Sequence, residues 1–423
     1  MVWSLKKYFP AAISDPFGYP SHVRVPPPPA YRQHRRIGRN GERVVKFGYL
    51  CNPATLNQSE TYQDVLEDIR NIAVHCDQNG FDSIWFSEHH FGFWERKVLP
   101  NPIMMGADIA ARTKRLRIGM ASVIIPFWNP IRLAEDIALL DQFSGGRVEL
   151  GVGRGNYRVE ALNLNPMADP GNKAGNYKVF AETLEILKRA FSQKTFAFKG
   201  DNYTYPQPGF KWERDVPKDA ADYIDLKTME LTHMALMPRT LQQPYPPLWQ
   251  TVDEPASIEF AAQNGLNIMM WRPTAKKLSH HFKHYQTTAV AAGRQLAFGA
   301  GTGILRDTFV ADTMAEARDL AAPHIMRTLN FSNWRGPGIY LDPDEQLAPD
   351  LTAELTRNLP YEWVAPRSLL FGTPDYVVEK LIELREVSHV ENVVICSGWG
   401  AIDKELTMKS LRLFSDKVLP KLT

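Results

Sequence analysis

The sequence predicts an α/β protein built on a closed (β/α)8 TIM barrel. Short apolar segments rich in β-branched and aromatic residues alternate with longer segments of helical periodicity, which is typical of βα units around a parallel sheet. Eight such pairs follow one another in order, a number that favours a closed barrel over an open sheet. The 423 residues are 44% hydrophobic and 23% charged, the composition of a globular protein that can bury a large core.

The first half of the chain contains four of the predicted pairs, all before residue 195. The first helix ends at Gly80, because glycine is favoured where helices terminate. The predicted strands are 44–50, 81–90, 116–125 and 147–153, and the first three are followed by helices at 61–79, 101–113 and 131–143.

The second half continues the alternation, with two long interruptions at about 194–247 and 331–390. Segments of this length usually carry function, so we expect these insertions to cover the barrel mouth. The first predicts a hairpin turning at Gly200 and Asp201, and the second a helix starting near Pro374. The predicted strands are 248–252, 267–271, 302–311 and 391–397, paired in order with helices 256–264, 275–291, 314–329 and 404–413.

Residues 1–43 differ from the barrel domain that we assign to residues 44–423. They contain the run PPPP and a basic cluster but show no hydrophobic periodicity, so we expect an extended arm. Sequence alone leaves open whether this arm is disordered or packs along the domain or a neighbouring subunit. Its several aromatic residues favour packing.

Charge and composition exclude several classes of partner. Lysine and arginine number 49 against 47 aspartate and glutamate, a net charge of +2, so we expect neither nucleic acid nor a membrane surface as partner. The amino terminus lacks the pattern of a signal peptide, and no segment approaches the ~20 apolar residues of a membrane helix. Three distant cysteines without a CxxC pair indicate a reduced, cytoplasmic protein.

The most informative local feature is the run Glu88, His89 and His90, placed where the second strand ends. The carboxyl ends of the strands form the active face of a β/α barrel, so these residues are candidates for catalysis or ligand binding. A buried histidine satisfied by Glu88 is the structural alternative. The HxH and HExxH patterns of zinc sites are absent, so we expect no metal.

A second candidate is the glycine-rich run from Gly151 to Tyr157, which follows the fourth strand. Gly153 would let the backbone approach a ligand closely, and Arg154 offers a fork of donors to a phosphate. The alternative is a tight strand exit with a solvated arginine, since the run is not a GxGxxG fingerprint.

Taken together, GFDSIWFSEHHF, ADIAARTKRLRIGMASVIIP, NPIRLAEDIALLDQFSGGRVELGVGRG and EFAAQNGL resemble the bacterial luciferase-like flavin monooxygenases. The resemblance runs from about residue 44 through 155 and returns at 245–271 and at GTPDYVVEKLIEL. It implies a β/α barrel that binds reduced FMN at its mouth.

The resemblance also implies roles for individual residues. His89 matches a histidine near the reacting flavin and substrate, with Glu88 and His90 beside it. The remaining positions match the cofactor site, where Ala121 and Ser122 correspond to a non-prolyl cis peptide beneath the flavin ring and Arg154 and Ser257 to phosphate contacts. The implied cofactor-binding residues are Ala121, Ser122, Gly153, Arg154, Tyr157, Asp253 and Ser257. Glu254 departs from the family pattern. Its carboxylate would repel a phosphate bound beside it.

The implied reaction is oxygenation of a small apolar or aromatic substrate by a peroxyflavin formed from reduced FMN and dioxygen. No nicotinamide domain is visible, so a separate flavin reductase would supply the reduced FMN, and the family pattern implies a homodimer. Aromatic residues near strand ends suggest the apolar substrate: Trp85, Phe93, Trp94, Phe127, Trp128 and Trp271. Two alternatives remain, a deazaflavin-dependent hydride-transfer enzyme of the same fold and a flavin-binding partner subunit without activity.

Overall fold

The computed structural model describes residues 45–52, 60–92, 98–214, 218–333, 336–399 and 402–422. The predicted amino-terminal arm, residues 1–43, lies outside these described residues.

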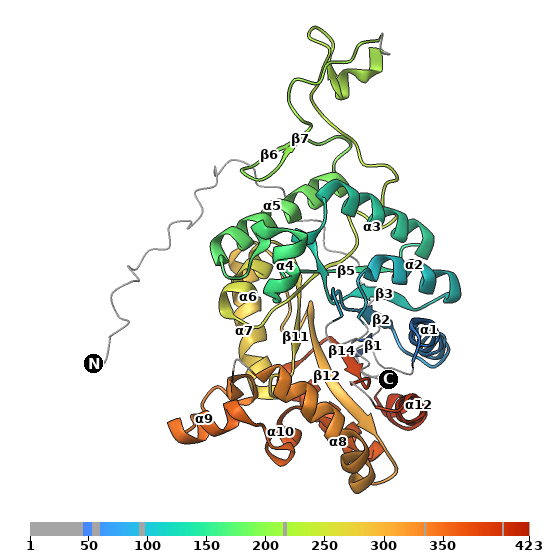
Figure 1. Cartoon of the computed structure of the whole chain (residues 1–423), viewed down its shortest axis with the longest axis vertical. Coiled ribbons are helices and arrows are strands. Elements are labelled where there is room, and N and C mark those ends of the chain that lie inside the picture. The colour runs from blue at the N-terminus through green and yellow to red at the C-terminus, as the bar shows by residue number, and fades with distance from the viewer. Residues whose placement is uncertain are drawn as a thin grey trace, which may run out of the picture.

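Within this part of the chain, eight parallel strands close into a barrel ringed by helices, which confirms the predicted fold (Figure 1). The ring runs β1-β2-β3-β5-β10-β11-β12-β14 and back to β1, and the pairing of β5 with β10 joins its first and second halves. The barrel strands are β1 (Lys46–Cys51), β2 (Ser83–Phe86), β3 (Arg117–Met120), β5 (Val148–Gly153), β10 (Leu248–Thr251), β11 (Asn267–Trp271), β12 (Thr302–Val310) and β14 (Asn392–Cys396). Two short strands, β4 (Val123–Ile124) and β13 (Leu370–Gly372), extend β5 and β12.

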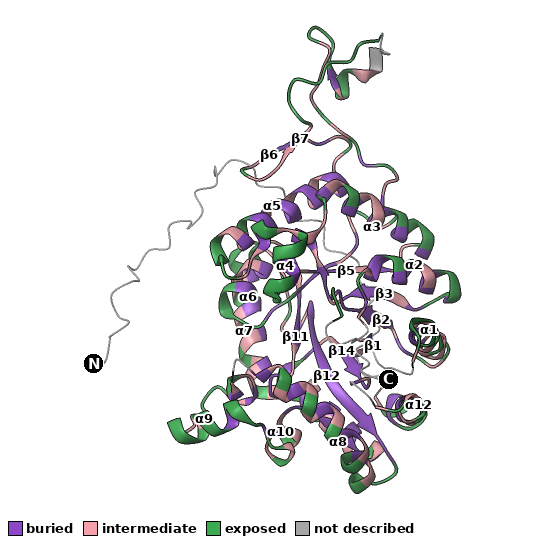
Figure 2. Cartoon of the chain, in the orientation of Figure 1, coloured by how far each residue is buried: buried purple, intermediate pink, exposed green. Residues whose placement is uncertain are grey.

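The surrounding helices start at the capping residues that the sequence provides. The Asn129 side chain, for example, accepts hydrogen bonds from the N–H groups of Ile131 and Arg132, and the same helix ends at Gly145 in the left-handed region. The helices of the ring are α1 (Tyr62–Gln78), α2 (Pro102–Arg112), α3 (Pro130–Ser144), α5 (Lys173–Ser192), α6 (Pro255–Gln263), α7 (Ala275–Ala291), α11 (Pro374–Ser388) and α12 (Lys404–Leu413). Figure 2 shows these helices buried on the side that faces the strands and exposed on the other.

The helix paired with β12 differs from the prediction. The sequence assigned residues 314–329 to this position, but α8 (Met314–Phe331) packs on β13 and on the end of β12, in a separate apolar cluster. The ring position is filled by α11, which packs against α7 and contributes Val377 and Leu381 to the main core. Both segments have an apolar face, so periodicity alone could not decide which one covers the barrel.

The barrel interior is filled by large side chains. Trp85 and Trp249 meet edge to face with ring centroids 5.7 Å apart. Gly119 makes room for them, because a Cβ atom there would lie 2.3 Å from the Trp85 ring. The interior cluster consists of Leu50, Trp85, Trp249, Met269, Leu305, Val394 and Cys396. A filled interior leaves the strand ends as the place where a ligand can bind.

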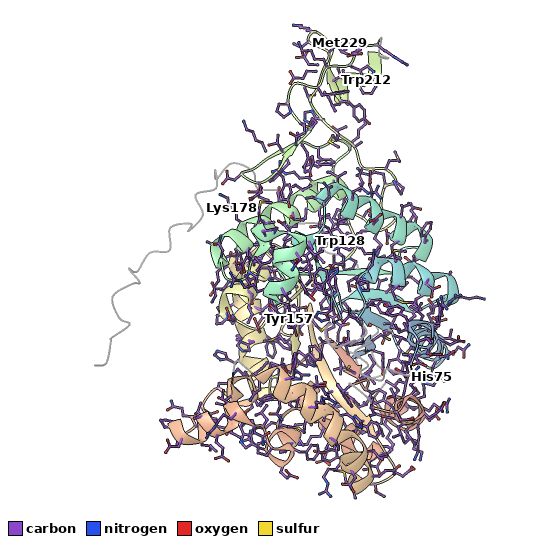
Figure 3. All side chains as sticks on the ribbon, viewed as in Figure 1. His75, Trp128, Tyr157, Lys178, Trp212 and Met229 are labelled. Carbon is purple, nitrogen blue, oxygen red and sulfur yellow. The ribbon has the colours of Figure 1, made fainter. Side chains whose placement is uncertain are left out.

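The first insertion contains two hairpins and does not cover the barrel mouth. Strands β6 (Phe198–Lys199) and β7 (Thr204–Tyr205) form the predicted hairpin, which hydrogen bonds to Glu182 on the outer side of α5. Gln242, near the end of the insertion, donates to the carbonyl oxygen of Val148 at the amino end of β5. The second hairpin consists of β8 (Ile224–Asp225) and β9 (Glu230–Leu231). Figure 3 places Trp212 and Met229 in a projection that leaves the barrel, so the expectation of a lid is wrong for this insertion.

The second insertion lies at the carboxyl ends of β12 and β14, on the predicted active face. It adds α9 (Pro349–Arg357) and α10 (Tyr361–Ser368), and its helix α11 starts at Pro374 as predicted. Side chains from α8, α9, α10 and β13 form a second apolar cluster with Trp399, which follows β14. In the described part of the chain, no helix combines the length and the apolar character needed to cross a membrane.

Candidate functional site

Glu88 lies just beyond β2 and has a fully buried side chain. Its Oε1 accepts a hydrogen bond from His90 Nε2 at 2.9 Å, and its Oε2 accepts one from the Ile124 N–H at 2.9 Å. The indole N–H of Trp128 donates to both carboxylate oxygens, at 3.1 and 3.2 Å. Burial raises the pKa of Glu88, and the bonds from His90, Ile124 and Trp128 oppose this rise. Glu88 therefore joins the loop after β2 to β4 and to the segment that precedes α3.

The two histidines follow the strand in a loop, and their side chains take separate partners. The His90 ring binds Glu88, as the structural alternative proposed, whereas His89 Nδ1 lies 3.5 Å from Glu160 Oε1. The same Glu160 oxygen accepts the His90 backbone N–H at 2.9 Å. The His89 side chain is 35% exposed, and its ring meets that of Tyr157 edge to face at 5.5 Å. His89 is thus the histidine of the pair that is open to a ligand.

Glu160 was not predicted from the sequence. It lies on the seven-residue helix α4 (Arg158–Leu164), directly after the glycine-rich run, and its side chain is only 5% exposed. A single carboxylate on so short a helix gives no periodic signal that separates a buried residue from an exposed one. Its position opposite two adjacent histidines becomes visible only in the folded chain.

The peptide bond between Ala121 and Ser122 is cis, which confirms that prediction. Ser122 Oγ lies 2.7 Å from Thr251 Oγ1, so the end of β3 contacts the end of β10. Gly153 lies beside them, where a Cβ atom would be 3.0 Å from Ile124 Cδ1 and 3.1 Å from Ser122 Cβ. The absence of a side chain at Gly153 therefore lets Ser122 and Ile124 pack closely against the end of β5.

Arg154 follows Gly153 and stacks on a ring of α5. Its guanidinium carbon lies 4.3 Å from the Tyr177 ring centroid, and its Nη1 donates to Asn176 Oδ1 at 3.3 Å. The Tyr177 hydroxyl is 3.5 Å from the carbonyl oxygen of Ala256, in the first turn of α6. These contacts bring Arg154 and the amino terminus of α6 to one side of the mouth, and these are the two elements to which the resemblance assigns the phosphate.

Ser257 is buried at the start of α6, but its hydroxyl is engaged within its own helix. It donates to the carbonyl oxygen of Glu254 at 2.7 Å and accepts the Glu254 N–H at 3.3 Å. Asp253 and Glu254 are both exposed. In the first turn of α6, Pro255 has no N–H and the Ser257 N–H donates to the Glu254 carbonyl oxygen, so a phosphate at this terminus would meet the Ala256 N–H.

The apolar residues near the mouth do not form one group. Trp85 belongs to the filled interior and Trp128 binds Glu88, whereas Phe93 and Trp94 lie outside the described residues. Trp271, the last residue of β11, packs on the interior cluster, and its buried indole N–H has no hydrogen-bond partner among the described residues. This N–H is a donor available to a bound ligand.

A buried ion pair that was not predicted from the sequence joins the end of β11 to β12. Arg272, next to Trp271, bonds to the fully buried Asp307 on β12 at 2.7 Å, and its guanidinium stacks on the Trp271 ring. The Trp399 indole N–H donates to the same carboxylate at 2.8 Å. Among the described residues, no group of three or more His, Cys, Asp or Glu side chains is arranged to hold a metal ion.

Comparison with known proteins identifies a family. Residues 45–389 match the family model described as luciferase-like monooxygenase. The chain is 28% identical to the oxygenase component of a flavin-dependent trigonelline monooxygenase from Acinetobacter baylyi over 279 residues, 65% of this chain and 67% of the relative. It is 38% identical to an alkanal monooxygenase alpha chain of the Kryptophanaron alfredi symbiont over 396 residues, which cover 89% of this chain and 98% of the relative.

Solved structures share the fold at lower identity. The monooxygenase RslO1 from Streptomyces bottropensis superposes with a TM-score of 0.70 at 22% identity, covering 89% of this chain and all of the other. The oxygenating constituent of 3,6-diketocamphane monooxygenase from Pseudomonas putida, solved with FMN, gives 0.69 at 20% identity, with 90% and 99% covered. A secondary alcohol dehydrogenase dependent on F₄₂₀ gives 0.61 at 17% identity over 90% of this chain and 99% of the other.

Proposed function

The chain belongs to the luciferase-like monooxygenase family, whose members are flavin-dependent enzymes, and we propose that it uses reduced FMN and dioxygen to oxygenate a small apolar or aromatic substrate. The observation that carries this proposal is one juxtaposition. His89 with Glu160, the cis peptide Ala121–Ser122, and Arg154 all follow strands that end at the same mouth.

The residues at the mouth fit the chemistry of FMN. Within the described residues, the Arg154 side chain donates one hydrogen bond, at 3.3 Å to the Asn176 amide oxygen, so its other donors can bind a phosphate together with the Ala256 N–H of α6. The flavin ring would lie against the Ala121–Ser122 peptide, where Ser122 contacts Thr251 across the mouth. Glu254 is the one poor fit, and its exposed carboxylate would have to turn toward solvent.

Reduced FMN, when bound, would supply the electrons that activate dioxygen, so that one oxygen atom enters the substrate and the other leaves as water. The protein must then exclude bulk water and control one proton. Glu160 faces His89 Nδ1 and would hold a proton there, which makes Nε2 the atom that takes or gives a proton. The bond between His90 and Glu88 keeps the second histidine away from this task.

The reduced cofactor would come from a separate flavin reductase. The described residues are accounted for by the barrel and its two insertions, with no nicotinamide-binding unit beside them. The similarity to the trigonelline enzyme supports this division of labour, because that enzyme is named as an oxygenase component. We also propose that the protein is a homodimer, as the family pattern suggests, which sedimentation would test directly.

The decisive experiment is anaerobic titration of the protein with reduced FMN, followed by mixing with dioxygen. A transient absorbance distinct from that of oxidised FMN would support the monooxygenase. If a reduced deazaflavin binds and reduced FMN does not, the reaction is hydride transfer, and binding of neither indicates a partner subunit without activity.

The role of His89 is tested by the fraction of flavin oxidation that yields product instead of hydrogen peroxide. We expect His89→Ala to bind FMN but to lose most of this coupling, by the 10²-fold or more typical of a general acid–base residue. The control is His233→Ala, which alters an exposed histidine of the first insertion. Equal coupling in both variants would remove His89 from the mechanism.

A further inference from the structure

A cavity of about 270 Å³ lies outside the barrel wall, on the outer face of β12. Along β12, Leu305 belongs to the barrel interior and Asp307 binds Arg272 at the mouth, so Arg306 between them points outward. The walls come from the start of α7, the end of α10, β13 and one face of α11. This cavity is therefore separate from the proposed flavin site.

Arg306 is the unusual residue of the lining. It is only 3% exposed, its Nη2 donates to the carbonyl oxygen of Pro273, and its Nη1 is buried without a hydrogen-bond partner among the described residues. Burial lowers the pKa of Arg306 to about 10, which still leaves it charged at neutral pH. A buried guanidinium with an unused N–H group is costly unless a ligand completes its hydrogen bonds.

The other charged side chains of the described lining neutralise one another. They form three ion pairs, Lys276 with Asp342 at 2.9 Å, Arg367 with Glu345 at 2.9 Å, and Lys380 with Glu383 at 2.8 Å. At the amino terminus of α7, the hydroxyl of the capping residue Thr274 donates a hydrogen bond to Asp342 at 2.6 Å. Arg306 remains as one positive charge without a carboxylate of its own in the lining.

We propose that this cavity binds a small organic carboxylate, with the carboxylate on Arg306. Besides the ion pairs and the hydroxyl groups of Thr274 and Ser368, the lining contains apolar side chains that can hold a short hydrocarbon chain, which a hydrated inorganic ion would not use. These are Ala275, Pro366, Leu369, Leu370 and Leu384. The volume is just below the range of drug-sized sites, so it admits a molecule of a few carbon atoms. A single carboxylate matches the single excess charge.

The test is calorimetric titration of the full-length protein with butyrate, with butyramide as a neutral molecule of the same shape. We expect butyrate to bind and butyramide to bind at least tenfold more weakly. Arg306→Met should reduce butyrate affinity at least tenfold. Ala275→Phe, which puts a ring into the cavity and leaves Arg306 in place, should do the same if Arg306→Met fails to fold.

The control is Lys283→Met, which removes one positive charge from the exposed side of α7 and should leave butyrate affinity within twofold. Inorganic phosphate is titrated in parallel. Tighter binding of phosphate than of butyrate would overturn the proposal, as would equal affinity for butyrate and butyramide. Butyrate binding that persists in both cavity variants would place the carboxylate elsewhere in the protein and also overturn it.

Discussion

Replacing Glu88 by glutamine tests whether its carboxylate holds the mouth together. The two oxygens accept four hydrogen bonds, from His90, from the Ile124 N–H and twice from Trp128. Glutamine has one acceptor oxygen and one NH₂ group. If the NH₂ group replaces Oε2 it faces the Ile124 N–H, and if it replaces Oε1 it faces the Trp128 N–H. In either orientation two donors oppose each other in a buried site.

The magnitude follows from this count. Hydrogen bonds to a charged group contribute about 1.5–3 kcal/mol each, and a buried donor left unsatisfied costs about 1–3 kcal/mol. Removing the charge recovers part of the burial cost that raises the pKa of Glu88. We therefore expect Glu88→Gln to lower the free energy of unfolding by about 2 kcal/mol at pH 7.

Urea unfolding followed by tryptophan fluorescence measures this difference. The matched control is Glu135→Gln on α3, whose partly exposed carboxylate pairs with Arg132 and where we expect less than about 0.5 kcal/mol. Trp128→Phe removes the donor that opposes one of the two amide orientations, so adding it to Glu88→Gln should cost less than the sum of the single changes, by about 0.5 kcal/mol or more. Strict additivity, or a Glu88→Gln variant as stable as the control, would refute this account of the network.

Three further predictions concern packing, pH and cofactor binding. Gly119→Ala puts a methyl group 2.3 Å from the Trp85 ring and should destabilise the fold by about 2–3 kcal/mol in thermal unfolding, whereas Gly338→Ala, with no atom within 4 Å of the new Cβ, should not. Burial, helped by neighbouring positive charges, lowers the pKa of His281 to about 4, so the unfolded chain binds this proton first and stability falls as pH drops from 6.5 toward 4. In urea titrations at several pH values, His281→Gln should lose that part of the pH dependence, about 1 kcal/mol after allowance for solvent screening, and an unchanged slope would contradict the assignment. Arg154→Met should weaken binding of reduced FMN at least tenfold in fluorescence titration without changing the unfolding midpoint, and unchanged affinity would move the phosphate elsewhere.

The sequence predicted the barrel well because each strand and helix carries its own local signal. Predicted helix 275–291 coincides with α7, whose Thr274 cap accepts the Lys277 N–H, and predicted strand 267–271 coincides with β11. The sequence assigned α8 to the ring position that α11 fills, because the hydrophobic periodicity of the two segments is similar. Both helices follow β12 and both have apolar faces, so only packing against α7 distinguishes them.

The candidate site was predictable where its residues are adjacent in the chain and not where they meet across it. Glu88, His89, His90 and Arg154 stand in short runs at strand ends, and the cis bond at Ala121 came from family resemblance. Glu160 escaped prediction because its contacts depend on where helix α4 crosses the loop after β2. A carboxylate 70 residues from its partner leaves no spacing to read.

The interior tryptophans explain why the site begins where it does. The indole N–H of Trp85 donates to Ser83 at 2.8 Å, and that of Trp249 donates to Glu149 at 2.7 Å, so neither needs a ligand as its acceptor. Trp271 lies nearer the carboxyl ends of the strands, and its buried N–H has no such partner within the described residues. Among the described residues, the indole N–H groups of the interior are thus satisfied at Trp85 and Trp249 and unsatisfied at Trp271. A ligand that accepts a hydrogen bond from Trp271 would satisfy this N–H. The rings of Trp85 and Trp249 fill the barrel below it and limit how deeply the ligand can enter.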